Sequence, residues 1–267
     1  MKMKLLLLAL GAYLLIVVLV YLFQDQLVFP GSGRGKGVRL ELPAGVQVET
    51  RRLHDGSEVR YAVADPTGQA QGLLLFFLGN FEDLRSGVTW AAAFARLDFA
   101  VVVPEYPTYG DSTGRVGVAP FLAAAEQAAE FAQQRAARLG VPFVVGGISL
   151  GSFSATHVAT FGKASQLLLL APLTSVAEVA QRQYWFLPVP WLLRHRFDNL
   201  GKVKAVRARA LVVHGEHDTI VPPECGKRLA AALGARFELA PGHDHNDLFF
   251  VLGEPLGARI REHLLGR

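Results

Sequence analysis

Five short apolar runs after residue 72 constrain the fold of this chain more than any other feature. They occupy residues 73–78, 100–104, 143–147, 167–172 and 210–215. Strands of a parallel sheet have this composition, because helices cover both faces of the sheet and bury both sides of each strand. Helix-like segments separate the runs, and the longest, residues 118–140, ends in arginines and a glycine, a helix stop signal. The alternation predicts an α/β fold with a mostly parallel, doubly wound sheet and right-handed crossovers.

The part of the chain before these runs has a different pattern. Residues 38–42, 46–53 and 58–64 alternate apolar and polar side chains, and short glycine-containing turns separate them. This pattern predicts an antiparallel meander beside the parallel sheet. The glycine-rich residues 29–37 that precede the meander indicate a linker. Because 267 residues are suited to one large domain, we expect residues 28–267 to form a single unit.

The N-terminal apolar stretch predicts a membrane anchor. Residues 5–23 carry no charged side chain, and as a helix they would be about 28 Å long, close to the thickness of the bilayer core. A cleaved signal peptide is the alternative, but no pair of small residues typical of a cleavage site follows the apolar stretch. We therefore expect residues 1–27 to be a retained single-pass anchor.

The charges around the anchor bear on its orientation and on possible partners. Lys2 and Lys4 favour a cytoplasmic N-terminus, which would place the domain outside the cytoplasm, although the basic residues at 33–39 weaken that bias. So short a basic run beside an anchor is suited to anionic lipid rather than to nucleic acid. The net charge of +4 is spread along the chain, and the single Cys225 excludes an internal disulfide. We expect membrane lipid, and no nucleic acid, as a partner.

One segment interrupts the alternation of strands and helices. Residues 175–203 lie between the fourth and fifth apolar runs, and they carry aromatic side chains around Pro188 and Pro190. These aromatic residues are Tyr184, Trp185, Phe186 and Trp191. A cap over a pocket, or a surface that dips into lipid, has such a composition. The alternative is an ordinary crossover whose aromatic residues belong to the core.

Two matches to Gly-x-Ser-x-Gly, centred on Ser149 and Ser112, are candidate nucleophile sites. A nucleophile elbow needs a buried strand that runs into the turn and a helix that leaves it. The apolar run at residues 143–147 and a helix-like segment flank Ser149, whereas loop-like residues flank Ser112 on both sides. The context therefore favours Ser149 as the nucleophile.

A serine nucleophile needs a base and an acid, which in this kind of fold follow it in the order acid, then histidine. Asp218 follows the apolar run at residues 210–215, and His243 and His245 lie in the next loop before a helix expected over residues 248–265. The spacing alone leaves both histidines open as the base. Three further carboxylates are less well placed: Asp198, Asp244 and Asp247.

A metal site is the alternative use of these side chains. Six candidate ligands could gather at one end of the sheet: His214, Glu216, His217, Asp218, His243 and His245. They lack the helical His-Glu-x-x-His spacing of common zinc hydrolases, and a metal would leave the Gly-Ile-Ser-Leu-Gly motif unexplained. We expect no metal and no organic cofactor.

Several motifs together resemble one family over nearly the whole chain. They are YLFQDQLVFP after the anchor, LGNFEDL at residues 78–84, YPTYGDSTG, GISLGS, GEHDTIVP, and HND at residues 245–247. The combination resembles the membrane-anchored branch of the α/β-hydrolase superfamily, related to serine aminopeptidase-like and monoacylglycerol-lipase-like hydrolases. The resemblance implies that His245 is the base and that the backbone N–H groups of Asn80 and Leu150 form the oxyanion hole. The family usually has His-Gly-Asn where this chain has Leu78-Gly79-Asn80, and backbone N–H donors do not depend on the side chain at position 78.

The sequence therefore predicts a membrane-anchored serine hydrolase. Its nucleophile, base and acid would be Ser149, His245 and Asp218, and its substrate an ester or thioester with a lipid-like acyl group. An aminopeptidase-like amide hydrolase is the enzymatic alternative. A hydrolase-fold scaffold that binds a partner without turnover is the alternative from another functional class, and Leu78 in place of histidine is its only sequence support.

Overall fold

The computed structural model describes residues 1–253 and 255–267, and within them eight strands form one mixed sheet. The strands are β1 (Val46–Arg52), β2 (Glu58–Ala64), β3 (Gly72–Phe77), β4 (Phe99–Pro104), β5 (Phe143–Ile148), β6 (Gln166–Leu170), β7 (Arg209–Gly215) and β8 (Arg236–Ala240). Their order in the sheet is β1-β2-β4-β3-β5-β6-β7-β8. Strands β3 to β8 are parallel to one another, whereas β2 is antiparallel to both β1 and β4. The predicted α/β class and mostly parallel sheet are confirmed.

Each of the five apolar runs forms a strand, and the strands bury both of their faces. Every residue of β3, β4, β5 and β6 is buried. On one face of β3, Leu74 and Phe76 pack with residues of helices α3 (Leu84–Ala95) and α9 (Pro255–Leu264). On the other face, Leu73 and Leu75 pack with helices α4 (Val118–Leu139), α5 (Gly151–Ala159) and α8 (Pro223–Leu233). Helices on both faces explain why these strands carry no alternating polar residues.

Helix α4 confirms the stop signal that its sequence contains. The helix ends at Leu139, and its C-cap Gly140 has a φ of +67°, a left-handed conformation that glycine adopts without strain. Its buried face consists largely of alanines, which allow the helix to approach the sheet closely: Ala124, Ala125, Ala128, Ala129, Ala132 and Ala136.

Three local expectations differ from the structure. Residues 38–42 form no regular strand and none of them is buried, although β1 lies at the end of the sheet and its outer edge pairs with no described strand. Residues 29–37 are docked rather than free: Phe29 is buried in the core, and Gly33 N–H donates to the carbonyl of Thr108. The helix expected over residues 248–265 is described as a 3₁₀ helix, η2 (Leu248–Gly253), and α9, while Glu254 lies outside the described residues.

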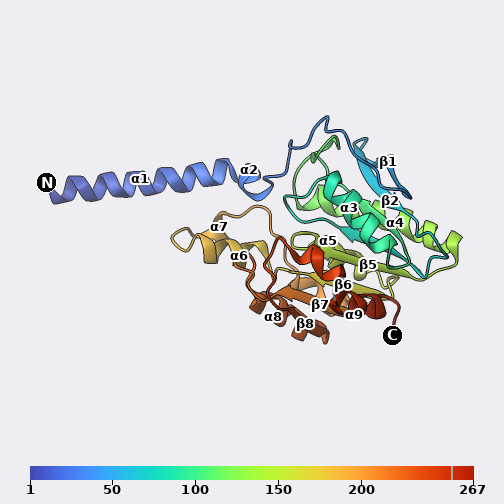
Figure 1. Cartoon of the computed structure of the whole chain (residues 1–267). Helices are drawn as coiled ribbons and strands as arrows, with labels where there is room; N and C mark the ends of the chain where they lie inside the picture. The colour runs from blue at the N-terminus through green and yellow to red at the C-terminus, as the bar shows by residue number, and fades with distance from the viewer. Residues whose placement is uncertain (254) are drawn as a thin grey trace.

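A long helix, α1 (Lys2–Leu22), projects from the α/β body and is followed by the short helix α2 (Gln24–Val28) (Figure 1). None of the residues of α1 is buried, and its mean hydropathy reaches 2.9. Among the described helices, α1 is the one long and apolar enough to cross a membrane, a property that a signal sequence shares. Between β6 and β7, residues 175–203 form α6 (Val176–Gln183), α7 (Val189–Leu192) and the start of η1 (Leu200–Ala205). We call residues 175–203 the cap segment.

Candidate active site

Ser149 lies on a sharp turn between β5 and α5. Its φ is +51°, which is unusual for a residue other than glycine, so the backbone of the turn is strained. The flanking glycines are required by close backbone contacts. A Cβ atom on Gly151 would lie 2.6 Å from the carbonyl oxygen of Leu78, and one on Gly147 would collide with the backbone of Gly151. The turn therefore has the strand–turn–helix geometry of a nucleophile elbow.

The structure brings Ser149, His245 and Asp218 into one chain of hydrogen bonds. Nε2 of His245 lies 3.0 Å from Oγ of Ser149, and Nδ1 of His245 lies 2.7 Å from Oδ2 of Asp218. The other carboxylate oxygen of Asp218 accepts the backbone N–H groups of Ile220 and Val221 at 3.0 and 2.8 Å. These contacts fix the orientation of the carboxylate and, through it, that of the imidazole.

The two candidate histidines occupy different positions. His245 lies between Ser149 and Asp218, whereas Nδ1 of His243 lies 3.0 Å from Oδ1 of Asp247. Asp247 also accepts the N–H of Asp244 at 2.9 Å, so it helps to shape the loop. The remaining spare carboxylate, Asp198, lies in the cap segment, where it accepts the N–H of Gly201.

His214 is a neighbour of Asp218 that sequence reasoning considered only as a metal ligand. It is fully buried on β7, its Nε2–H donates to the carbonyl of Val221 at 2.7 Å, and the same nitrogen lies 3.1 Å from Oδ2 of Asp218. Burial is the largest influence on the pKa of Asp218 and raises it. The hydrogen bonds with His214 and His245 act against burial, and the net result is a pKa lowered from 3.8 to about 2. Asp218 is therefore ionised at neutral pH.

Residues 78–80 lie directly beside Ser149. A Cβ atom on Gly79 would lie 3.6 Å from Cβ of Ser149. Within the described residues, the backbone N–H groups of Asn80 and Leu150 have no hydrogen-bond acceptor. Both residues line the same pocket as Ser149. Two unpaired N–H donors beside a serine can accommodate an oxyanion.

Side chains from several elements hold this loop although its first residue is leucine rather than histidine. Leu78 is buried in the core, and its carbonyl accepts the hydroxyl of Tyr106 at 2.8 Å. The Asn80 amide donates to the carbonyl of Val28 at 2.7 Å, and its oxygen accepts the hydroxyl of Tyr109, also at 2.7 Å. The loop thus depends on contacts that a histidine at position 78 need not supply.

Glu82 is a second residue of the site that sequence reasoning missed. One oxygen of its carboxylate accepts the N–H of Gly79 at 2.5 Å, and the other accepts Nε1–H of Trp90 at 2.8 Å. Burial is the main influence on the Glu82 carboxyl and raises its pKa, whereas these two hydrogen bonds lower it. It lies within the motif LGNFEDL at residues 78–84, but the sequence indicates no role for it. It could have been found only from its place between the 78–80 loop and Asp83, which caps α3 by accepting the N–H of Arg85.

A cavity of about 390 Å³ opens onto Ser149 and His245. Its wall is predominantly apolar, and it is built from α1, α2, the cap segment and the loops of the sheet. The apolar residues of this wall include Val20, Leu27, Val28, Ile148, Leu173, Val176, Val179, Leu187, Val189, Leu192, Leu193, Ile220 and Phe249. A pocket of this composition fits an apolar group such as an acyl chain.

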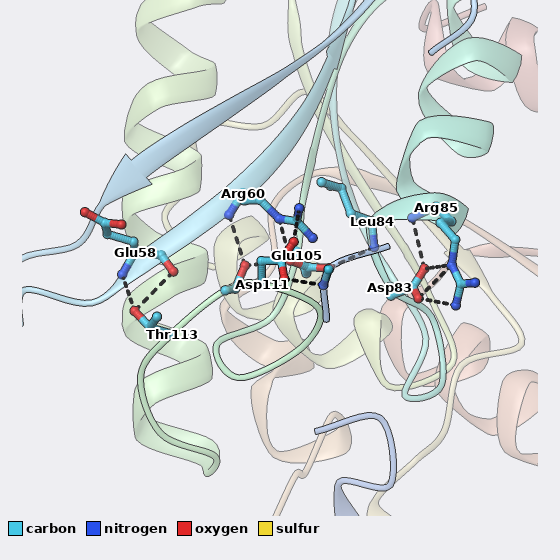
Figure 2. A network of polar contacts seen from close by, with 10 residues as sticks. Glu58, Arg60, Asp83, Leu84, Arg85, Glu105, Asp111 and Thr113 are labelled. Carbon is cyan, nitrogen blue, oxygen red and sulfur yellow. Dashed lines mark hydrogen bonds and ion pairs between the residues drawn. The ribbon is translucent and has the colours of Figure 1, made fainter. Parts of the chain in front are cut away.

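Ser112, the other candidate serine, belongs to a buried polar network. Its hydroxyl donates to Glu105 at 2.7 Å and accepts the N–H of Arg60 at 3.1 Å. Glu105 also accepts the N–H of Leu84, and Arg60 pairs with Asp111 at 2.7 Å (Figure 2). Its neighbours include no histidine base, so this serine has a structural environment.

No arrangement in the described residues, 1–253 and 255–267, favours a metal. No group of three or more histidine, cysteine, aspartate or glutamate side chains is arranged to hold a metal ion there. His214, His245 and Asp218 are instead linked by the hydrogen bonds given above.

Solved structures of similar shape identify the fold. The esterase PF2001 of Pyrococcus furiosus superposes with a TM-score of 0.71 at 12% identity, over 87% of this chain and 96% of that one. A soluble variant of monoglyceride lipase from Saccharomyces cerevisiae gives 0.65 at 14% identity, over 86% and 97%. The thioesterase domain of the curacin biosynthetic pathway gives 0.58 at 15% identity, over 82% and 99%. The chain has the α/β-hydrolase fold.

Sequence comparison finds relatives of higher identity than these structures. No family model matches the chain. Two proteins of Mycobacterium tuberculosis, the uncharacterized proteins Rv2307c and MT2364, are each 29% identical to it over 255 residues, which is 93% of this chain and 90% of each relative. The α/β-hydrolase fold predicted from the motifs is confirmed by the structural comparisons, and α1 precedes it as an apolar helix.

Proposed function

We propose that this α/β-hydrolase is a membrane-anchored serine hydrolase that cleaves an ester or thioester bond of an acyl substrate. The observation that carries the proposal is the hydrogen-bonded series Asp218–His245–Ser149 at the base of an apolar pocket. A serine needs an adjacent base, and that base needs an orienting group, for nucleophilic catalysis at neutral pH.

In the proposed reaction, Oγ of Ser149 attacks the acyl carbonyl carbon while its proton passes to Nε2 of His245. Asp218 stays ionised and stabilises the imidazolium that forms. The backbone N–H groups of Asn80 and Leu150 donate to the tetrahedral oxyanion. His245 then protonates the leaving alcohol or thiol. A water molecule, activated by the same histidine, releases the acid and restores Ser149, so the reaction as proposed uses no metal or organic cofactor.

Ester or thioester cleavage is favoured over an aminopeptidase activity by the composition of the pocket. A protonated amine in an apolar pocket is most often paired with a carboxylate. Glu82 is the carboxylate among the described pocket residues, its oxygens already hold the N–H groups of Gly79 and Trp90, and the rest of the wall is predominantly apolar. Hydrolysis rates for an ester, a thioester and an anilide with the same acyl group test this preference. A faster anilide reaction would favour the amidase instead.

The role of the anchor is also part of the proposal. Residues 1–27 would remain attached and hold the domain, residues 28–267, at the membrane, with the N-terminus in the cytoplasm and the domain outside it. A C-terminal reporter that is accessible in intact cells is the expected result. A reporter protected on the cytoplasmic side would reverse the orientation.

Labelling of membranes with a fluorophosphonate probe tests the proposed chemistry. Wild type and Ser112→Ala should be labelled, whereas Ser149→Ala should not. The pair His245→Ala and His243→Ala tests the base, since labelling should be lost only in the first. If wild type stays unlabelled while a known serine hydrolase in the same membranes reacts, the non-catalytic scaffold becomes the better description.

A further inference from the structure

The end of the cap segment between its two helices is apolar and exposed. Residues 184–193, which we call the cap tip, contain no charged side chain, and arginines at positions 182 and 194 flank them. Trp185 is 79% exposed and Trp191 is 89% exposed, so the cap tip is not an ordinary core crossover. Exposed aromatic residues with flanking cations are typical of protein surfaces at a membrane interface.

The cap tip lies along the membrane-anchor helix and is attached to it at two levels. The hydroxyl of Tyr13, in α1, donates to the carbonyl of Phe186 at 2.9 Å. Nearer the body, the Gln24 amide donates to the carbonyl of Leu192 at 3.2 Å, and its oxygen accepts the N–H of Arg194 at 2.7 Å. Figure 1 shows α6, α7 and the loop between them beside the end of α1 nearest the body.

The position of Tyr13 determines how deep the cap tip must lie. Helix α1 has 21 residues and is therefore about 31 Å long, close to the hydrocarbon thickness of about 30 Å. Tyr13 precedes the last helical residue, Leu22, by about 14 Å along the axis. If the cap tip lay outside the hydrocarbon, only the uncharged residues 5–12, about 12 Å of helix, could cross the bilayer. That length is too short, so a spanning α1 carries the cap tip into the leaflet.

Most backbone polar groups of the cap tip have a hydrogen-bond partner; among the described residues the exceptions are the N–H groups of Trp185 and Phe186 and the carbonyl of Trp191. Every carbonyl from residue 184 to residue 190 accepts a hydrogen bond. The Gln181 amide alone contacts three of these carbonyls, those of residues 184, 185 and 187. Pro188 and Pro190 have no N–H to satisfy. In lipid, backbone polar groups must find partners within the protein, whereas a water-exposed loop has no such requirement.

We propose that the cap tip is inserted into the acyl-chain layer of the lipid leaflet beside α1. The pocket that contains Ser149 has Val20 and Leu27 on the anchor side and Leu187 and Leu192 on the cap side. With the cap tip inserted, the side of the pocket between the anchor and the cap segment therefore faces the lipid tails. The consequence for catalysis, which rests on the proposed function, is that a long-chain acyl ester reaches Ser149 laterally from the leaflet rather than from water.

Tryptophan fluorescence tests the insertion directly, because the chain has three tryptophans and the third, Trp90, is only 2% exposed. The full chain is placed in phosphatidylcholine vesicles that carry bromine either at mid-depth in the acyl chains or not at all. Acyl-chain bromine should strongly quench wild-type emission. A variant with Trp185→Phe and Trp191→Phe, which retains only Trp90, should lose most of that quenching. Iodide in the water should have little effect on either protein.

Equal quenching of wild type and the double variant by brominated lipid, or strong quenching of wild type by iodide, would overturn the insertion. A separate pair of measurements tests the consequence for the substrate. Trp185→Glu combined with Trp191→Glu should lower hydrolysis of a long-chain ester held in vesicles at least tenfold. Fluorophosphonate labelling in detergent should be unchanged, because neither tryptophan lines the pocket.

The two measurements separate the two proposals. If bromine quenches but wild type is not labelled by the fluorophosphonate, the insertion stands and the proposed hydrolase activity fails. If wild type is labelled but bromine does not quench, the hydrolase stands and the insertion fails. Equal loss of vesicle and detergent activity in the glutamate variant would contradict lateral entry of the substrate.

Discussion

Gly151→Ala is expected to slow the proposed reaction about 100-fold without touching any of the three proposed catalytic side chains. A Cβ atom at position 151 would lie 2.6 Å from the carbonyl oxygen of Leu78, and even closer to that of Phe77. Ordinary contact begins at 3.4 Å, so the two backbones must separate by at least 0.8 Å (3.4 − 2.6). The displaced segment leads directly into Asn80, one of the two proposed oxyanion donors. A misplacement near 1 Å at a reacting centre costs about 100-fold in rate, and overpacking costs about 1–3 kcal/mol of stability.

The assay is the rate of fluorophosphonate labelling, measured below the thermal unfolding midpoint of the variant. The matched control is Gly68→Ala, because a Cβ atom at position 68 would meet nothing within 4 Å. We expect the control to react at the wild-type rate and Gly151→Ala to react about 100-fold more slowly. A folded Gly151→Ala protein that is labelled as fast as wild type would refute the argument that backbone contact between the elbow and residues 77–78 positions the oxyanion donors.

Three further variants test the surroundings of the site. Asp218→Asn should lower the free energy of unfolding at neutral pH by about 2 kcal/mol, because the folded pKa is about 2 rather than 3.8. The difference in free energy of unfolding between wild type and Asp218→Asn should be complete above about pH 4 and vanish as the pH falls toward about 2. Urea unfolding that shows the same difference at every pH would contradict the assignment. Glu82→Gln should slow labelling about tenfold, because an amide has only one oxygen for the two N–H groups that the carboxylate accepts. Labelling of the variant at the wild-type rate would rule this out. Ser112→Ala should keep the wild-type labelling rate but lose about 1–3 kcal/mol of stability, since a buried carboxylate and a backbone N–H each lose a partner; slower labelling of this variant would reopen the choice of serine.

The strands could be predicted from sequence because their composition follows directly from burial. The apolar runs at residues 73–78 and 143–147 lie within one residue of β3 and β5 at either end. Residues 38–42 have an equally clear alternating pattern but form no strand. Alternation predicts that one side of a segment is buried, but none of residues 38–42 is buried, and a local pattern does not say whether a segment packs against the sheet at all.

The candidate site also contains residues that could be placed from sequence and residues that could not. Ser149 and Asp218 could be placed from sequence, because each follows a buried strand at the edge where the carboxyl ends of parallel strands meet. His245 could not be separated from His243 by spacing, and it is the three-dimensional path of the loop that brings His245 to within 3.0 Å of the serine. The sequence indicates no role for Glu82, although it lies within the LGNFEDL motif, because its contacts are with Gly79 nearby and with Trp90 eight residues further along.

Helix α1 is the feature for which the sequence and the structure lead to different descriptions. Hydropathy alone describes residues 5–23 as an apolar helix separate from the domain, and a signal sequence would have the same hydropathy. In the structure, Gln24 is only 3% exposed, and its side chain bonds to the cap segment through both its oxygen and its nitrogen. Asp25 next to it contacts Arg194 at 3.0 Å and His195 at 2.7 Å. Cleavage after the apolar stretch would remove Val20 from the wall of the pocket and Tyr13 from the cap tip. Helix α1 therefore contributes to the wall of the pocket that the proposed function assigns to the acyl group.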